Sequence, residues 1–251
     1  MKKVYISALS IAVAALLTIT GCKKDSPPVS SNNIVYFSMT ADNSIVPFTS
    51  VTKPGGPAVL SIAPNVAASG GVGMVWTAAG ANVSSFKFDA KKDGTAFEII
   101  AAGIANANLF SNQGSTYPNI PVGNYTNVTV HAILSPSLSN GLSLILQGVY
   151  VNKTGNQIPV EVDVDDNAEI IATANNINVD GSSNLSAALA LHLDQLSAGI
   201  TTSDMDQATR STVNTVSNSI LISNASNVNI YAKILANIGG AGGASVVAVQ
   251  K

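Results

Sequence analysis

The chain has few of the residues on which several classes of protein depend. Its 251 residues include one cysteine, one tryptophan, two histidines and a single arginine, Arg210, and charged residues make up 10% of the total. A single cysteine excludes an internal disulfide, so stability must come from the hydrophobic core. Nucleic-acid recognition needs clustered arginine and lysine. A net charge of −2 with one arginine therefore argues against a nucleic-acid partner.

Catalytic patterns are equally scarce. A nucleophilic hydrolase needs a nucleophile, a base and an orienting group within hydrogen-bond reach. His131 and His192 each lie inside a strand-like run, without a G-x-S-x-G motif, and neither belongs to an H-x-H or H-x-x-x-H pair that would suit a transition metal. The sequence predicts a protein that is not an enzyme. The alternative, an extracytoplasmic hydrolase, requires one of these histidines to lie beside a serine or a carboxylate in a cleft.

The first 22 residues carry the most specific motif. Lys2 and Lys3 precede an uncharged, mostly apolar run over residues 4–20, which is typical of an export signal rather than a membrane span. The run ends in Ile-Thr-Gly-Cys at 19–22, which resembles the lipobox of bacterial lipoproteins. The resemblance implies cleavage after Gly21 and lipidation of Cys22. Two or more acyl chains anchor a protein stably to a membrane.

This motif divides the chain into three parts. We expect a lipoprotein signal peptide at 1–21, and then the lipidated cysteine with a flexible, proline-containing tether at 22–33. Residues 34–251 are expected to form a β-sandwich domain, and the sequence leaves open a division into two β subdomains. The expected location is the outer membrane, on the cell surface or on the periplasmic face.

Short apolar runs punctuated by turn residues predict a mainly β fold. Residues 85–90 (SFKFDA) alternate apolar and polar side chains, and the turn at 92–94 leads to a returning strand at 96–101, as in a β-hairpin. Many strands at this spacing favour an antiparallel β-sandwich, transthyretin-like or immunoglobulin-like, over a βαβ layout. Further strands are expected at 34–39, 58–62, 72–77, 126–134, 142–151, 158–164, 168–174, 177–179, 185–193, 219–222, 228–235 and 245–249.

One segment departs from the β pattern. Apolar residues at near-helical spacing predict a short helix at about 203–217, with Ser203 and Asp206 as its capping box. The glycine-rich stretch 239–243 is expected to be a flexible hairpin loop.

Four segments together resemble uncharacterised lipoproteins of the Bacteroidota that carry a transthyretin-like (prealbumin-like) β-sandwich. They share the pattern P-x-G-x-Y before a strand, then G-x-Y with a later I-P-V, and a Leu-Asp pair that enters a helical connection. The resemblance covers about half of the chain and implies a fold and a location, but no catalytic residue. The segments are 81–99, 120–134, 144–164 and 190–209.

An acidic cluster suggests one candidate metal site. Asp163, Asp165, Asp166 and Asn167 follow one another closely, and hard oxygen ligands of this kind suit Ca²⁺. The spacing is not that of an EF-hand, and the alternative is a solvated strand face that discourages edge pairing. No other cofactor is expected.

The function expected from these observations is a membrane-anchored, non-enzymatic binding, structural or adhesion module of the cell envelope. Its partners would be the membrane, through Cys22, and a glycan or a protein, with ligand-binding residues unknown. A carbohydrate-binding accessory protein is the alternative. It predicts an exposed aromatic strip, for example at Trp76, although a single tryptophan is more often a core residue.

Overall fold

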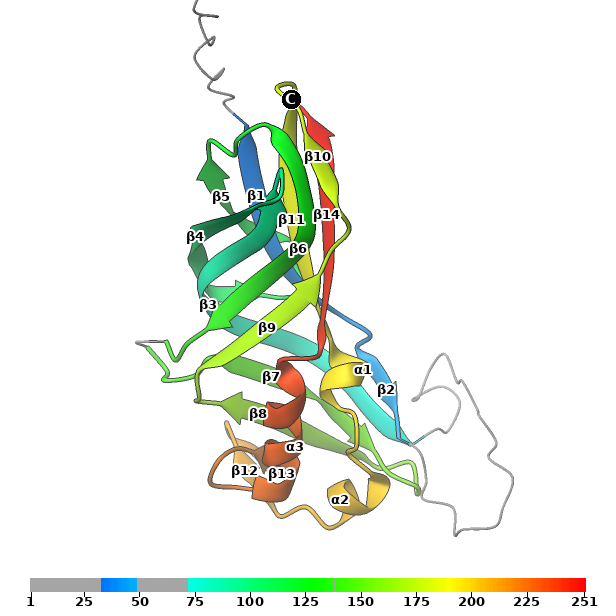
Figure 1. Ribbon diagram of the computed structural model, residues 1–251. Helices are drawn as coiled ribbons and strands as arrows, with labels where there is room; N and C mark the ends of the chain where they lie inside the picture. Colours follow the sequence, from blue (N-terminus) through cyan, green and yellow to red (C-terminus); the bar gives the residue numbers. More distant parts are fainter. Residues whose placement is uncertain (1–32, 49–71, 138) are drawn as a thin grey trace, which may run out of the picture.

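The computed structural model describes residues 33–48, 72–137 and 139–251. Strands dominate these residues, and they form a 4-stranded and a 10-stranded sheet with three helices (Figure 1). The structure thus confirms a mainly β, sandwich-like fold with short helical segments. Cys22, the signal peptide at 1–21, the tether up to residue 32 and the strand expected at 58–62 lie outside the described residues.

The small sheet has the strand order β14-β11-β1-β5. Strands β1 and β11 pair in parallel, whereas β5 and β14 flank them antiparallel, so their connections run through the other sheet. The bounds of the small-sheet strands are β1 Ile34–Asp42, β5 Gln113–Pro118, β11 Ser183–His192 and β14 Gly242–Gln250.

The large sheet follows the order β10-β6-β3-β7-β8-β13-β12, with β2 and β4 also paired to β3 and β9 paired to β6. All of these pairs are antiparallel except β8 with β13. The bounds are β2 Ile45–Pro47, β3 Gly73–Lys92, β4 Thr95–Asn108, β6 Gly123–Leu134, β7 Leu144–Val151, β8 Gln157–Val164, β9 Ala168–Thr173, β10 Ile177–Val179, β12 Arg210–Val213 and β13 Val216–Ile222.

Strand β3 is 20 residues long and branches the large sheet at Asn82. The residues before Asn82 pair with β7, and those after it pair with β6, while β4 follows the opposite edge of β3. At the branch, the Asn82 N–H donates to the carbonyl of Ser143 (2.9 Å), and its carbonyl accepts from the N–H of Ser135 (3.2 Å). The Asn82 side chain also donates to the Ser135 carbonyl at 2.7 Å.

The hydrophobic core lies between the two sheets and continues between the helices and the strands on which they pack. Phe37 of β1 stacks on Phe86 of β3, with ring centroids 5.6 Å apart, and both side chains are fully buried. Alternation along β3 places Phe86 and Phe88 on the core side and Lys87 on the other side. The small sheet packs against the upper strands of the large sheet, and the helices lie beside its lower strands, β7 and β8 (Figure 1).

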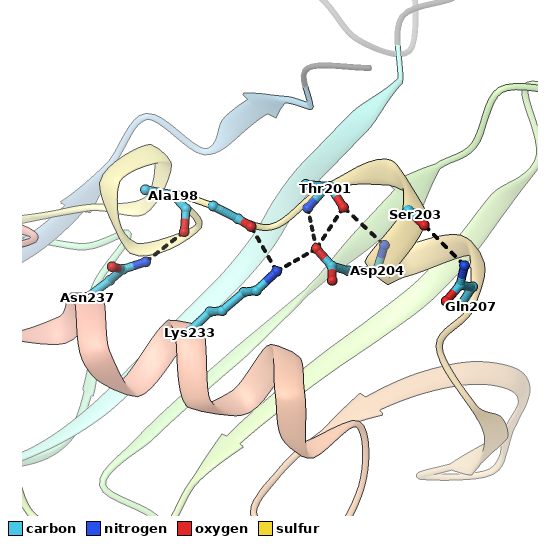
Figure 2. A network of polar contacts seen from close by, with 8 residues as sticks. Ala198, Thr201, Ser203, Asp204, Gln207, Lys233 and Asn237 are labelled. Atoms are coloured by element: carbon cyan, nitrogen blue, oxygen red, sulfur yellow. Dashed lines mark hydrogen bonds and ion pairs between the residues drawn. The ribbon is translucent and has the colours of Figure 1, made fainter. Parts of the chain in front are cut away.

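The three helices are α1 Leu193–Leu196, α2 Thr202–Asp206 and α3 Val228–Ile238. A capping box begins α2: the Asp204 N–H donates to Thr201 Oγ1 at 3.2 Å, and the Thr201 N–H donates to Asp204 Oδ2 at 2.7 Å. Lys233 of α3 donates to the same carboxylate at 2.7 Å and to the Gly199 carbonyl at 2.9 Å (Figure 2). Burial alone would raise the pKa of Asp204, but the hydrogen bonds from Lys233 and Thr201 hold it below its ordinary value.

None of the helices in the described ranges has both the length and the apolar character needed to cross a membrane.

The helical segments differ from the expected ones in two places. Within 203–217 only α2 is helical, capped by Thr201 rather than Ser203; the rest forms the β12–β13 hairpin, whose turn residues Asn214 and Thr215 both have positive φ. Conversely, the strand expected at 228–235 is helix α3. Its isoleucines favour a strand by propensity, but their helical spacing aligns Ile230, Ile234 and Ile238 on one buried face, and tertiary packing decides.

Other strands match their expected positions closely. The hairpin of β3 and β4 turns at Asp93 and Gly94, as the alternation in residues 85–101 predicts, although both strands extend well beyond it. Strands β5 and β2 were not expected. Strand β5, with its Gln, Gly and Ser, has no apolar pattern, and the Ile-Val-Pro of β2 is too short to show an alternation. The hairpin loop expected at 239–243 is not found: residues 239–241 connect α3 to β14, and Gly242 and Gly243 are the first residues of that strand.

A glycine in β7, Gly148, allows this strand to approach β3 closely. A Cβ on Gly148 would lie 2.5 Å from the carbonyl oxygen of Val75 and 3.0 Å from the Trp76 ring. We expect Gly148→Ala to lower the free energy of unfolding by about 1–3 kcal/mol through overpacking. Gly181→Ala, where an added Cβ meets nothing within 4 Å, is the matched control. Urea unfolding of both variants is the measurement, and equal stabilities would contradict this prediction.

Candidate functional site

The face of the large sheet that points away from the core carries most of the polar groups able to bind a ligand. On β7 the core side holds Leu144, Leu146 and Tyr150, so Ile145 and Gln147 occupy the opposite, outer side. The same alternation places Glu161 of β8 and His131 of β6 on this outer side.

A pocket opens on this outer face beside the branch at Asn82. Its cavity of about 360 Å³ falls in the range of roughly 300–1,000 Å³ typical of small-molecule sites. Ala78 and Gly80 of β3 contribute to its lining and leave room above the strand because their side chains are small or absent. We call it the amide pocket after its polar lining residues, Asn82, Asn106, Asn108, Asn140, Ser143 and Gln147.

A β-bulge shapes one wall of the amide pocket. Val83 pairs with Ile104 and Ala81 pairs with Ala107, so two residues of β4, including Asn106, oppose the single residue Asn82. Asn106 has a left-handed backbone conformation, with φ of 51°. Asparagine tolerates this conformation better than most side chains, and bulges commonly redirect a side chain next to a functional site.

Gln147 connects the amide pocket to a buried carboxylate. Its amide nitrogen donates to Glu161 Oε2 at 2.7 Å, and Asn214 of the β12–β13 turn donates to both oxygens of Glu161 at 2.9 and 2.8 Å. Glu161 is only 8% exposed. A smaller cavity of about 200 Å³ lies between the same three residues, so Gln147 borders both cavities.

Of the predicted calcium ligands, the structure brings only Asp165 and Asp166 to a common partner, the hydroxyl of Tyr231. Asp165 accepts hydrogen bonds from Asn224 (2.5 Å) and from the Tyr231 hydroxyl (3.1 Å), which also donates to Asp166 at 2.9 Å. Asp163 instead lies on the outer side of β8, and Asn167 is exposed. Within residues 33–48, 72–137 and 139–251, no group of three or more His, Cys, Asp or Glu side chains could hold a metal ion.

His131 lies at the centre of a charged cluster on β3, β6 and β9. Its Nδ1 lies 2.7 Å from Glu169 Oε1, and its Nε2 lies 3.0 Å from Asp89 Oδ2. Lys87 forms ion pairs with Asp89 (3.0 Å) and Glu98 (3.2 Å), and hydrogen bonds to these carboxylates raise its pKa. Both ring nitrogens face carboxylates, so His131 links the three strands. The hydroxyl within reach of its Nε2 is that of Thr129, at 3.3 Å.

His192 forms a second histidine–carboxylate pair at the end of the parallel strands. Its Nδ1 lies 2.6 Å from Asp42 Oδ1, because His192 and Asp42 are register partners on β11 and β1. The other nitrogen, Nε2, faces Gly243, where an added Cβ would approach it to 2.3 Å. The arrangement has a base and an orienting group, but the position of a nucleophile is taken by the glycine backbone.

Two further residues singled out in the sequence have different outcomes. Trp76 is 3% exposed and belongs to the core, so it offers no platform for a sugar. Cys22 lies outside the described residues and its lipidation stays a prediction. Comparisons with protein-family models, with curated proteins and with solved structures return no match.

Nothing in the sequence pattern indicates the amide pocket. Its asparagines lie among many others in an asparagine-rich chain, and they come from segments far apart in sequence. A bulge, a branch in the sheet and a loop bring them together, and none of these has a pattern visible in the residues alone.

Asp163 provides a test of the electrostatics beside Glu161. Burial, and then the charges of Glu161 and Asp165, raise the pKa of Asp163 to about 6. The unfolded chain has an Asp pKa of about 3.9, so the folded state holds this proton more tightly. The resulting stability is fully present below about pH 4 and is lost as the pH rises through about 6.

Asp163→Asn should remove the loss of stability that accompanies ionisation of Asp163 as the pH rises. We expect its free energy of unfolding near neutral pH to exceed that of the wild type by roughly 1–2 kcal/mol, with the difference vanishing below about pH 4. Urea unfolding at several pH values is the measurement. Asp180→Asn is the control of opposite sign, because hydrogen bonds from Ser182 lower the pKa of Asp180. A variant at 163 that is less stable than the wild type near neutral pH would refute the prediction.

Proposed function

We propose that the chain is an exported, lipid-anchored binding protein of the cell envelope that holds its ligand in the amide pocket and catalyses no reaction. The observation that carries this proposal is the pocket itself, a cavity of about 360 Å³ built at the branch of the large sheet. Among the described residues that line it there is no titratable side chain, which suits recognition better than acid–base chemistry.

The histidine geometry supports a role without catalysis. General-base chemistry on a nucleophile needs the base within hydrogen-bond reach of the group that it activates. His131 is held between Glu169 and Asp89, and His192 between Asp42 and the backbone at Gly243. Neither histidine lines the amide pocket.

The anchor rests on the lipobox resemblance at residues 19–22. Lipidation at Cys22 would tether the β domain to the outer membrane through residues 22–33 and leave the outer face of the large sheet free for a ligand or a partner protein. The resemblance to lipoproteins of the Bacteroidota supports the same location.

Replacement of the lipidated residue tests the anchor. We expect Cys22→Ser to abolish incorporation of radiolabelled palmitate and to shift the protein from the membrane fraction, because only the thiol accepts the diacylglyceryl group. The measurements are labelling and cell fractionation of the full chain expressed in a Gram-negative host. Lys23→Ser, next to the cysteine, should leave both unchanged. Labelling that survives Cys22→Ser would disprove the anchor.

A pocket-filling substitution tests the binding role. Ala78 is exposed and lines the amide pocket, so Ala78→Phe fills it without disturbing the core. We expect Ala78→Phe to weaken binding about tenfold or more to whichever purified envelope fraction retains the wild type, polysaccharide, peptidoglycan or outer-membrane protein. Ala102→Phe, on the exposed side of β4 outside the pocket, is the control. If no fraction retains the wild type, or if Ala78→Phe binds equally well, the binding role is wrong.

A further inference from the structure

The hydrogen bonds around the amide pocket fix which atom of each amide remains available. Asn82 donates its Nδ2 to the carbonyl of Ser135, and Gln147 donates its Nε2 to the carboxylate of Glu161. The acceptor oxygens Asn82 Oδ1 and Gln147 Oε1 are therefore the atoms left for a ligand. The Glu161 carboxylate can only accept, so it keeps the Gln147 amide from turning over.

Two asparagines on the other walls have the opposite orientation. Asn108 Oδ1 accepts from the N–H of Phe110 at 3.0 Å, and Asn140 Oδ1 accepts from the N–H of Leu142 at 3.0 Å and from the Ser137 hydroxyl. Their Nδ2 groups are thus left as donors. The amide of Asn106 makes no hydrogen bond to any other described residue, so it adds one donor group and one acceptor.

The available groups include both donors and acceptors, and none carries a charge. A ligand that matches them must itself donate and accept hydrogen bonds at several points, and a neutral ligand suits them best. Hydroxyl groups do both, and a charged ligand would lose its hydration without gaining a compensating charge. Ala78, Gly80 and Leu142 supply the apolar part of the lining, which suits the C–H face of a sugar ring.

We infer that the amide pocket binds a neutral saccharide, with Asn106 and Gln147 as specificity-determining residues. This inference rests on the proposed function, since it names the ligand of the same pocket. Recognition relies on amides, because Trp76 is buried in the core and none of the described residues that line the pocket is aromatic. Without stacking on a ring the affinity per site should be modest, with a Kd on the order of 0.1–1 mM.

Titration calorimetry and a glycan array with the full chain in detergent test the inference. The probes are neutral oligosaccharides of glucose, mannose, galactose, xylose and N-acetylglucosamine, with polygalacturonate and heparin as anionic comparisons. We expect binding of at least one neutral probe, and roughly three- to tenfold weaker binding for each of Asn106→Ala and Gln147→Ala. Asn178→Ala, an exposed asparagine on β10, should bind like the wild type, and melting temperatures establish that all variants fold.

The outcomes separate the two proposals. Binding of a neutral probe that is unaffected by Asn106→Ala and Gln147→Ala overturns the site. Preference for an anionic probe, or for a peptide in the retained envelope fraction, overturns the inference that the ligand is a neutral saccharide. If Ala78→Phe also weakens binding of that anionic probe or peptide, the amide pocket keeps its proposed binding role. Absence of binding to every probe and every envelope fraction overturns both the ligand class and the proposed function.

Discussion

Asn82 holds the large sheet together at the point where strand β3 changes neighbours. Its N–H and carbonyl bond to Ser143 and Ser135, which lie at the two ends of the connection between β6 and β7. A buried strand must satisfy every backbone donor and acceptor, so β3 can pass from one neighbour to the next only if some residue bonds to both. The side-chain amide of Asn82 adds a third bond to the same connection.

The amide pocket follows from this branch. Strand β4 continues along the opposite edge of β3 and accommodates the change in register with the bulge at Asn106. The loop before β7 then returns past Asn140 to Ser143, which bonds to the Val164 carbonyl through both its N–H and its hydroxyl. Polar groups from β3, β4 and β7 therefore surround one place on the outer face, where Ala78 and Gly80 leave space.

The two faces of the large sheet have different roles, one in folding and the other in presenting polar groups. The core face packs Phe86 against Phe37 of the small sheet and the lower strands against the helices, and this burial supplies the main driving force for folding. The outer face instead carries paired polar groups such as His131 with Glu169 and Asp89. Such a surface offers polar groups to a ligand, and the amide pocket is one of the hollows on it.

By itself, the sequence determined those features that depend on neighbouring residues. Alternation along 85–101 predicted the β3–β4 hairpin, because side chains of a strand point alternately to two faces, and the lipobox motif at Cys22 predicts lipidation through a contiguous pattern. The tertiary structure decided the rest. Helix α3 forms because its isoleucines meet a core on one side. The chain after α2 forms the β12–β13 hairpin, with its turn at Asn214 and Thr215, in place of a longer helix. The amide pocket was decided by tertiary structure alone, since the branch and the bulge that assemble it arise from strand pairing between distant segments.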